Sequence, residues 1–209
     1  MSVVVTLSRP LCFVGMSGVG KSYWSARLAR DARFVVHDCD AEIGRRLSSI
    51  VTPDPGESLV TALGRWMGMP WTTGYAEREA RYLALEEDVT REALDAAREG
   101  HVVDTTGSVI YLPRDLLDAL RAKCRIVYLR TPDTRQGAML KRYLEEPKPV
   151  VWAGAFPRAE DPRAALPAAY AELLRTRDRA YASLAHVTLD GGELEASPPS
   201  TRELLSRIA

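Results

Sequence analysis

The stretch "LCFVGMSGVGKSYWSARLAR", residues 11–30, decides the fold of this chain. It begins with four apolar residues, LCFV, which predict a buried strand. A turn with three glycines follows and ends at Lys21 and Ser22. Trp24 and Leu28 then lie at helical spacing, which predicts a helix directly after the turn. The stretch therefore predicts a strand, a glycine-rich turn and a helix in direct succession.

The glycine-rich turn matches the pattern G-x-x-x-x-G-K-S, which is typical of a phosphate-binding loop. Glycines let successive backbone N–H groups turn inward around a phosphate, and the following helix directs its dipole at the same anion. In this pattern Lys21 reaches the β- and γ-phosphates, and the Ser22 hydroxyl binds Mg²⁺. A glycine-rich surface turn is the alternative, and the flanking strand and helix disfavour it. The residues predicted to contact the nucleotide here are Gly15, Ser17, Gly18, Val19, Gly20, Lys21, Ser22 and Tyr23.

Composition narrows the class of protein. The 209 residues suit a single domain, 1–209, with one core and a lid. Lys plus Arg and Asp plus Glu balance at 28 each, so we expect neither nucleic acid nor a membrane surface as a partner. No apolar run is long enough to span a membrane, and the first residues do not resemble a signal peptide. Cys12 and Cys124 lie in or beside apolar runs, which favours buried free thiols and a cytoplasmic location.

Strands and helices are expected to alternate along the chain. The predicted strands are 11–14, 34–37, 101–103, 125–129 and 186–189. The predicted helices are 21–31, 41–50, 75–99, 113–123, 132–145, 166–184 and 200–208, with a surface linker, "DGGELEASPPS", before the last one. This alternation predicts an α/β fold of the P-loop NTPase type: a five-stranded parallel sheet with helices on both faces and a lid. Ligands of such sheets bind at the carboxyl ends of the strands.

Two stretches interrupt this alternation and are long for plain connections. Residues 51–74 are rich in Pro, Gly and Trp, and we assign them to an acceptor-binding region of about 41–85. An ordinary packed loop is an equal alternative. The second stretch, 146–168, carries five prolines and is interpreted as part of a lid of about 141–168.

Carboxylates follow the second predicted strand. Asp38 and Asp40 stand two apart in "HDCDAEI", and residues i and i+2 of an extended segment face the same side. We expect Asp38 to hold the metal or its water and Asp40 to accept a hydroxyl proton. The alternative is that Asp40 is only the N-cap of the next helix.

Polar residues also follow the third predicted strand, in "VVDTTGSVI". Asp104 is a weak candidate for a magnesium-associated carboxylate. Thr106, Gly107 and Ser108 are candidates for hydrogen bonds to a polar ligand. A turn followed by a helix cap is an equal alternative for this segment.

The chain resembles shikimate kinase, a small P-loop kinase of the nucleoside monophosphate kinase type. The segments that carry the resemblance are "FVGMSGVGKS", "DCDAEIGRRL", "EEDVTREAL" and "YAELLRTRDRAYASLAHVTLD". The resemblance places Asp40 at the family's acceptor-binding aspartate and Arg177 at an arginine that grips the shikimate carboxylate. It also places Lys148 at the position of a catalytic arginine in the family's lid, and Lys141 or Arg142 near the position of the residue that packs on adenine.

The departures from the family fall in the acceptor site. Residues 106–108 read TGS where the family has three glycines. Leu83 stands where the family has a second carboxylate-binding arginine, although Arg78 or Arg81 lies one turn away. The insert "GRWMGMPWTTGY" has no evident counterpart. We therefore expect the phosphate-donor half of the site to be kept and the acceptor half to be rebuilt.

The leading hypothesis is an ATP-dependent kinase that phosphorylates a hydroxyl of a small polar, anionic metabolite. ATP is favoured over GTP because the chain lacks an N-K-x-D signature. The alternatives are a genuine shikimate kinase, a nucleoside or nucleotide kinase whose Trp66, Trp71 and Tyr75 stack a base, and a nucleotide-binding module without turnover. We expect a monomer or a weak dimer. The predicted site residues are Lys21, Asp40 and Lys148 for catalysis, Arg142 with the loop for ATP, Asp40, Thr106, Gly107, Ser108 and Arg177 for the acceptor, and Ser22 and Asp38 for Mg²⁺.

Overall fold

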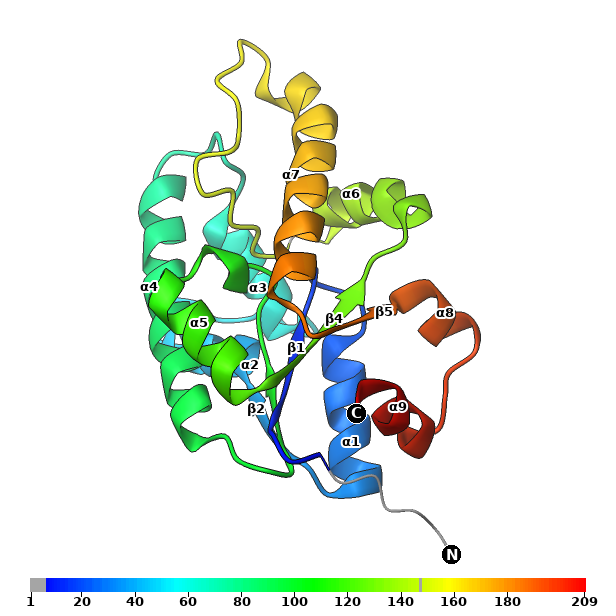
Figure 1. Cartoon of the computed structure of the whole chain (residues 1–209). Helices are drawn as coiled ribbons and strands as arrows, with labels where there is room; N and C mark the ends of the chain where they lie inside the picture. The colour runs from blue at the N-terminus through cyan, green and yellow to red at the C-terminus, as the bar shows by residue number, and fades with distance from the viewer. Residues whose placement is uncertain (1–6, 147) are drawn as a thin grey trace, which may run out of the picture.

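A five-stranded parallel sheet forms the centre of the molecule. The computed structural model describes residues 7–146 and 148–209. The strands run in the order β2-β3-β1-β4-β5, and all neighbouring pairs are parallel (Figure 1). They are β1 (Leu11–Val14), β2 (Val35–Asp38), β3 (His101–Asp104), β4 (Arg125–Arg130) and β5 (Val187–Asp190). The predicted fold class and the five predicted strands are confirmed, with boundaries that differ by one residue or so.

Helices cover both faces of the sheet. The α-helices are α1 (Lys21–Ala32), α2 (Cys39–Arg46), α3 (Leu59–Met67), α4 (Tyr75–Ala96), α5 (Arg114–Lys123), α6 (Gln136–Glu145), α7 (Pro162–Leu184), α8 (Gly191–Ala196) and α9 (Thr201–Ile208). Two short 3₁₀ turns, η1 (Val109–Tyr111) and η2 (Asp133–Arg135), lie between them. α1, α8 and α9 cover one face, and α2, α4, α5 and α7 cover the other.

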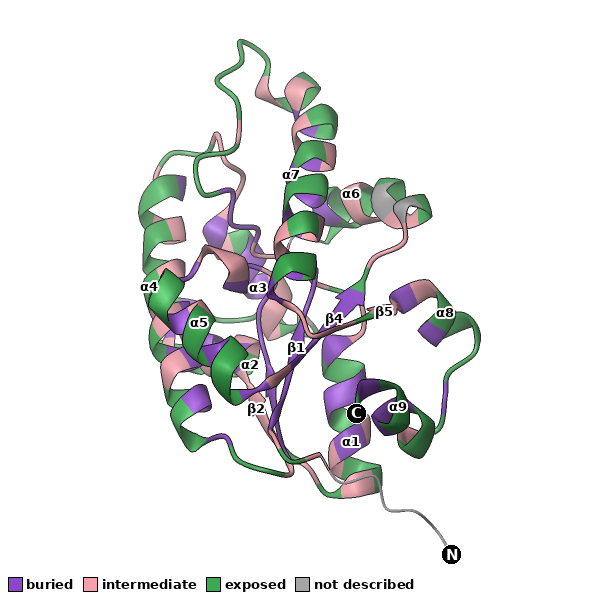
Figure 2. Cartoon of the chain, viewed as in Figure 1, coloured by how far each residue is buried: buried purple, intermediate pink, exposed green. Residues whose placement is uncertain are grey.

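Alternation along the strands divides the apolar side chains between two cores. Leu11 and Phe13 of β1 point into the core under α1 and α9, whereas Cys12 and Val14 point into the larger core under α4 and α7. All four are fully buried, and the central strands are buried on both faces (Figure 2). Such apolar runs are expected of central parallel strands.

The start of α2 differs from the prediction. The helix begins at Cys39 rather than at residue 41, and Asp38 is its N-cap: Oδ1 of Asp38 accepts a hydrogen bond of 2.9 Å from the Ala41 N–H. The alternative of Asp40 as the N-cap is therefore wrong. Asp40 lies in the first turn of the helix, where its carboxylate is available for other contacts.

Two connections contain more helix than the sequence patterns indicated. Residues 51–74 include α3, which is capped by the Ser58 side chain. The predicted surface linker after β5 is wrong, because Asp190 accepts from the N–H groups of Gly192 and Glu193 and starts α8. Turn-forming residues such as Asp and Gly are also good helix starts, so the local pattern did not separate the two outcomes.

Two further observations concern the described part of the chain. None of its helices combines the length and the hydropathy that a bilayer span requires. Cys12, Cys39 and Cys124 are buried free thiols, as expected for the first and the third.

Two histidines form a pair across β2 and β3. His37 Nε2 and His101 Nδ1 are 2.9 Å apart, and the rings are stacked with centroids 5.1 Å apart. One of these nitrogens must be an unprotonated acceptor. Burial lowers the pKa of both rings, and the nearby Arg98 lowers each pKa further. The pair is therefore most stable when both rings are neutral.

We predict that the pair makes stability depend on pH. Each folded-state pKa lies below the unfolded value of about 6.5. The stability that the pair contributes is therefore fully present above pH 6.5, and it is lost as the pH falls from that value through the folded-state pKa. Urea unfolding from about pH 7.5 to about pH 5.5 should show a smaller loss of unfolding free energy for His37→Gln than for the wild type. An equal or larger loss in the variant would contradict this assignment.

Candidate active site

The glycine-rich loop after β1 is held in one conformation by its packing. Gly15 has a φ of 141°, and a Cβ there would lie 2.6 Å from the Leu129 carbonyl oxygen. Only glycine fits this position. Lys21 is 5% exposed, and its ammonium donates to the carbonyls of Gly15 (2.9 Å) and Met16 (3.2 Å). The Lys21 side chain therefore folds back over the loop, at the place where a phosphate would lie.

Two more cations approach the same loop, one from the last turn of α6 and one from the segment after it. A Cβ built on Gly18 would lie 3.6 Å from Arg142 Nη1 and 3.7 Å from Lys148 Nζ. Burial lowers the pKa of Lys148, and Arg142 and Lys21 lower it further. Three positive side chains thus surround one turn of backbone, which is an arrangement suited to a polyphosphate. Lys141 instead pairs with Glu145 on the surface of α6, so Arg142 is the one of the two candidates that reaches the loop.

A cavity of about 250 Å³ lies between the loop and α6, and we call it the α6 cavity. Across it, Arg135 pairs with Glu195 of α8. Its mixture of apolar and cationic side chains suits the base and phosphates of a nucleotide. Its lining includes Met16, Ser17, Gly18, Val19, Gly107, Met139, Arg142, Tyr143, Lys148, Pro149, Tyr170 and Arg177.

Two carboxylates meet at the ends of β2 and β3. Asp38 and Asp104 are register partners on these parallel strands. Asp104 is 3% exposed, its Oδ2 has no hydrogen-bond partner, and the nearby Ser22 hydroxyl lowers the pKa of this carboxyl group. Burial raises the pKa of Asp104 to about 6, and the charge of Lys21 acts in the opposite direction. An unpartnered buried carboxylate oxygen beside a hydroxyl and a second carboxylate is a fitting set for Mg²⁺.

Few protein ligands are available to such an ion. The described residues contain no group of three or more His, Cys, Asp or Glu side chains that could hold a metal. Mg²⁺ at phosphate-transfer sites is usually held by one or two carboxylates together with phosphate oxygens and water. Ser22, Asp38 and Asp104 match that pattern, and Asp104 is a stronger candidate than its sequence context indicated.

Asp40 lies near Lys21, and both residues line one cavity. Its Oδ1 accepts a hydrogen bond of 3.1 Å from the hydroxyl of Tyr82, which is 2% exposed. Burial raises the pKa of Asp40, whereas Lys21 lowers it and Asp38 raises it. Asp40 is thus a positioned carboxylate with an elevated pKa.

Asp40 faces a second cavity, of about 520 Å³, which we call the α3 cavity. It runs from the glycine-rich loop to the start of α3. Its lining residues are Ser17, Gly18, Gly20, Lys21, Ser22, Tyr23, Asp38, Asp40, Ala41, Ser58, Leu59, Val60 and Lys148. Lys148 lines both cavities, so it lies where a nucleotide phosphate and a second ligand would meet.

The predicted acceptor residues after β3 do not form one open surface. Thr106 and Ser108 are buried, and their hydroxyls donate to the two oxygens of Glu86, the Ser108 bond being 2.5 Å. Glu86 is fully buried on α4, one helical turn from Tyr82. Burial raises the pKa of Glu86 to about 7, although both hydroxyls lower it. Gly107 instead borders the α6 cavity.

Glu86 was missed by the sequence analysis. In "LALEEDV" it is the first of three consecutive acids, and such a run is usually exposed. Its helical spacing from Tyr82 and Val89, both apolar-facing positions, was the available signal.

Arg177 is buried and makes four hydrogen bonds to protein atoms. The guanidinium donates to the carbonyls of Gly107 (3.0 Å) and Val151, and more weakly to the Tyr111 hydroxyl and Met16 Sδ. It also lies over the Tyr111 ring, 5.2 Å from its centroid. A role of Arg177 in binding an acceptor group stays a prediction, because most of its N–H donors are directed at the protein.

The replacement arginine near Leu83 is not found among the described side chains of α4. Arg78 donates to the carbonyls of Met67 (3.0 Å) and Thr73 (3.1 Å), which fixes the segment before α4. Arg81 is exposed. Leu83 packs on the core beneath α4.

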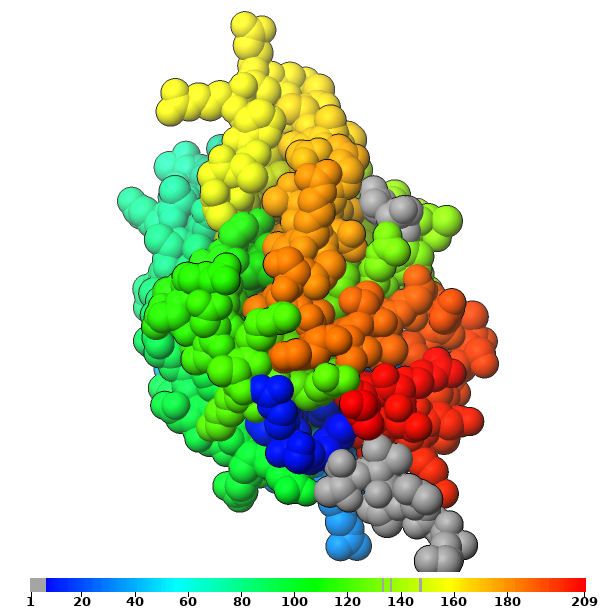
Figure 3. Space-filling view, in the orientation of Figure 1, coloured from blue at the N-terminus to red at the C-terminus, as the bar shows by residue number. Residues whose placement is uncertain are grey.

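The segment after Lys148 is packed onto α4 and α7. Val150, Val151 and Trp152 are buried, and the Val150 carbonyl accepts from the Tyr75 hydroxyl (2.7 Å). Glu79 accepts from the backbone N–H of Trp152 and of the next residue. The predicted lid is therefore docked at its base. The part that follows projects beyond α7 at one end of the molecule (Figure 3).

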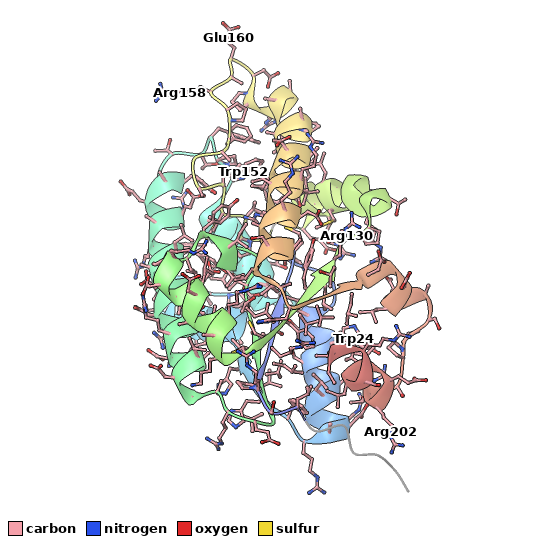
Figure 4. All side chains as sticks on the ribbon, viewed as in Figure 1. Trp24, Arg130, Trp152, Arg158, Glu160 and Arg202 are labelled. Atoms are coloured by element: carbon pink, nitrogen blue, oxygen red, sulfur yellow. The ribbon has the colours of Figure 1, made fainter. Side chains whose placement is uncertain are left out.

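Aromatic side chains connect this lid to the insert. Trp152 packs against Phe156 with centroids 4.9 Å apart, and Trp71 packs against Phe156 at 5.5 Å. Trp152 also lies edge-on to Tyr170 of α7. Trp71 is therefore engaged in hydrophobic packing with Phe156. In Figure 4 Trp152 lies inside the fold, whereas Arg158 and Glu160 extend from the tip of the lid.

Known proteins match this chain in structure. A shikimate kinase from Acinetobacter baumannii, solved in complex with shikimate, has a TM-score of 0.61 and 23% sequence identity, over 96% of this chain and 90% of that one. A shikimate kinase from Bacteroides thetaiotaomicron has a TM-score of 0.60 and 18% identity, over 96% of each chain. No protein-family model matches the sequence, and no curated protein does. The chain has the fold of the shikimate kinases.

We predict that the docked lid contributes to global stability. Trp152→Ala removes a 1%-exposed indole and should lower the unfolding free energy by about 3–5 kcal/mol in urea titration. Arg158→Ala, on the exposed tip of the same lid, is the matched control and should change it by less than about 0.5 kcal/mol. Equal effects of the two substitutions would show that the lid base is not part of the cooperative core.

Proposed function

We propose that this protein is an ATP-dependent phosphotransferase that phosphorylates a hydroxyl group of a small polar metabolite. The observation that carries the proposal is the arrangement around one glycine turn. Arg142 and Lys148 approach Gly18, Lys21 donates to two carbonyls of the same loop, and Asp40 lines the adjoining α3 cavity together with Lys21. A phosphate-binding cradle that borders a positioned carboxylate is what transfer to a hydroxyl requires.

In the proposed reaction the acceptor oxygen attacks the γ-phosphorus as the bond from that phosphorus to the β-phosphate oxygen breaks. Asp40 orients the hydroxyl and accepts its proton, for which its raised pKa is suitable. Lys21 and Lys148 stabilise the charge on the transferred group and on the departing ADP. Ser22, Asp38 and Asp104 would hold Mg²⁺, which would neutralise phosphate charge.

Observations at the acceptor end bear on the alternatives. Shikimate itself is disfavoured because Leu83 offers no hydrogen bond, Arg78 is bonded to the carbonyls of Met67 and Thr73, and Arg81 is exposed. A nucleoside acceptor loses its main support, since Trp71 is engaged with Phe156. A module without turnover is disfavoured by the retention of Lys21 and Asp40 together in one site.

The proposal predicts that Lys21→Ala abolishes phosphoryl transfer in a folded protein. The measurement is release of ADP and incorporation of label from γ-labelled ATP into a small-molecule extract. The rate should fall by at least about 10²-fold, the usual effect of removing such a charge. Lys141→Ala, on the exposed face of α6, should leave the rate unchanged. A Lys21→Ala rate above about a tenth of the wild-type rate would refute the assignment.

A second prediction concerns Asp40 as the general base. Asp40→Asn should leave ATP affinity nearly unchanged and lower turnover by about 10²–10⁴-fold. Tyr82→Phe removes the 3.1 Å hydrogen bond that positions Asp40, so its turnover should fall by a smaller factor. Asp38→Asn should retain the helix cap, because Asn caps nearly as well as Asp, and provides a fold control for α2. Wild-type turnover in Asp40→Asn would remove Asp40 from the mechanism.

A further inference from the structure

One side of α4 contacts both the lid and the predicted general base. Tyr75, Glu79 and Tyr82 stand at i, i+4 and i+7, so they lie on the same side of this helix. The Tyr82 hydroxyl donates to Asp40 (3.1 Å). Nearer the start of the helix, Tyr75 and Glu79 hydrogen-bond to the segment that follows Lys148. A single element of secondary structure therefore holds two parts of the proposed site.

Glu79 is the anchor of the lid base. Its Oε1 accepts from the backbone N–H groups of Trp152 (2.5 Å) and Ala153 (3.0 Å), and the Tyr75 hydroxyl is 2.6 Å from the same oxygen. Ala153 has a φ of 49°, a left-handed conformation that is unfavourable for alanine. A carboxylate that accepts from both N–H groups stabilises this turn. Glu79 therefore fixes the backbone four residues after Lys148.

The connection from this anchor back to Lys148 is short and restrained. Pro149 follows Lys148 directly, and its ring fixes the backbone φ there. The next residue, Val150, is 7% exposed, and its carbonyl accepts from the Tyr75 hydroxyl (2.7 Å). A displacement of the anchor would therefore be passed on to Lys148, whose ammonium lies 3.7 Å from the position of a Cβ on Gly18.

Glu79 lies outside both cavities. The described lining residues of the α6 cavity and of the α3 cavity do not include it, whereas Lys148 belongs to both sets. A change at Glu79 would therefore affect the reaction through the lid and not through contact with ATP or the acceptor. Arg177, which anchors the neighbouring Val151, lines the α6 cavity itself, so a variant at Arg177 would not separate these two effects.

We propose that Glu79 is a positioning residue of the reaction: it holds the base of the lid on α4 so that Lys148 stays at the glycine-rich loop. The inference rests on the proposed phosphotransferase function and deepens it. Because Tyr82 holds Asp40 from the same helix, α4 fixes the lid cation and the general base relative to each other. Stabilisation of the transferred phosphoryl group requires such placement, and a displacement of about 1 Å can lower a rate by about 10²-fold.

The test is a double-mutant cycle between Glu79 and Lys148. The full chain is incubated with Mg²⁺, γ-labelled ATP at varied concentration and a small-molecule extract, and labelled phosphate esters are measured. Lys148→Ala should lower turnover by about 10²-fold. Glu79→Ala should lower it by about tenfold, and its KM for ATP should change by less than about threefold because Lys21 and Arg142 remain at the phosphates.

The cycle separates positioning from a general loss of structure. In the Lys148→Ala background, Glu79→Ala should lower turnover by less than about twofold, since the side chain that it positions is gone. An equal factor in the two backgrounds would overturn the inference and leave the phosphotransferase function standing. No labelled ester from the wild type would overturn both.

Two further variants serve as controls. Glu79→Gln keeps an oxygen that can accept from both N–H groups, so its turnover should stay within about threefold of the wild-type value. A loss as large as that of Glu79→Ala would contradict the hydrogen-bonding role. Glu77→Ala, at an exposed position of the same helix, should leave turnover unchanged.

A variant of the neighbouring contact keeps the inference testable if Glu79→Ala does not fold. Tyr75→Phe retains the buried ring and removes the hydroxyl that holds the Val150 carbonyl. It should lower turnover in the wild-type background and have less effect in the Lys148→Ala background. Wild-type turnover in Tyr75→Phe, or an equal loss in both backgrounds, would overturn the inference.

Discussion

The register of the parallel strands is the constraint on which the rest of the site depends. Asp38 and Asp104 occupy the same level of β2 and β3, and Phe13, near the end of β1, is level with Asp104. Parallel strands present their carboxyl ends at one edge of a sheet. The strand pairing alone therefore brings the loop after β1 and both carboxylates together. A shift of one residue in this pairing would turn Asp104 to the opposite face of the sheet and separate it from Ser22.

The sheet edge provides the donor half of the site, and packing of the lid completes it. Arg142 and Lys148 come from a segment more than 120 residues after the loop they approach. They reach Gly18 because the residues that follow are anchored: Val151 by Arg177, and Trp152 by Phe156 and Tyr170. The cationic cradle is therefore a product of an apolar core as well as of charge.

Much of this arrangement could be predicted from local sequence, and the remainder depends on tertiary contacts. The glycine-rich loop, Lys21, and the aspartates Asp38 and Asp40 around the end of β2 were predictable because each belongs to a short segment whose geometry its own residues impose. The hydrogen-bond partners of Glu86 and Arg177 were not predictable. A hydroxyl 20 residues away in the chain, or a carbonyl of the lid, produces no periodic pattern in the sequence. The N-cap of α2 shows the same limit on a smaller scale. Either aspartate of "DCD" is a suitable N-cap residue by type, and Asp38 takes this place because β2 ends there.

The anchoring of the lid by Arg177 also has a consequence for the timing of ligand exchange. A path into the α6 cavity that requires the segment around Val151 to lift must break the bond between its carbonyl and a guanidinium that is 2% exposed. Opening is then slow relative to side-chain motion, and a bound molecule is retained for as long as the segment stays down. On such a path the dwell time of a ligand would be set by the backbone carbonyl of Val151, an aliphatic residue outside the lining of both cavities.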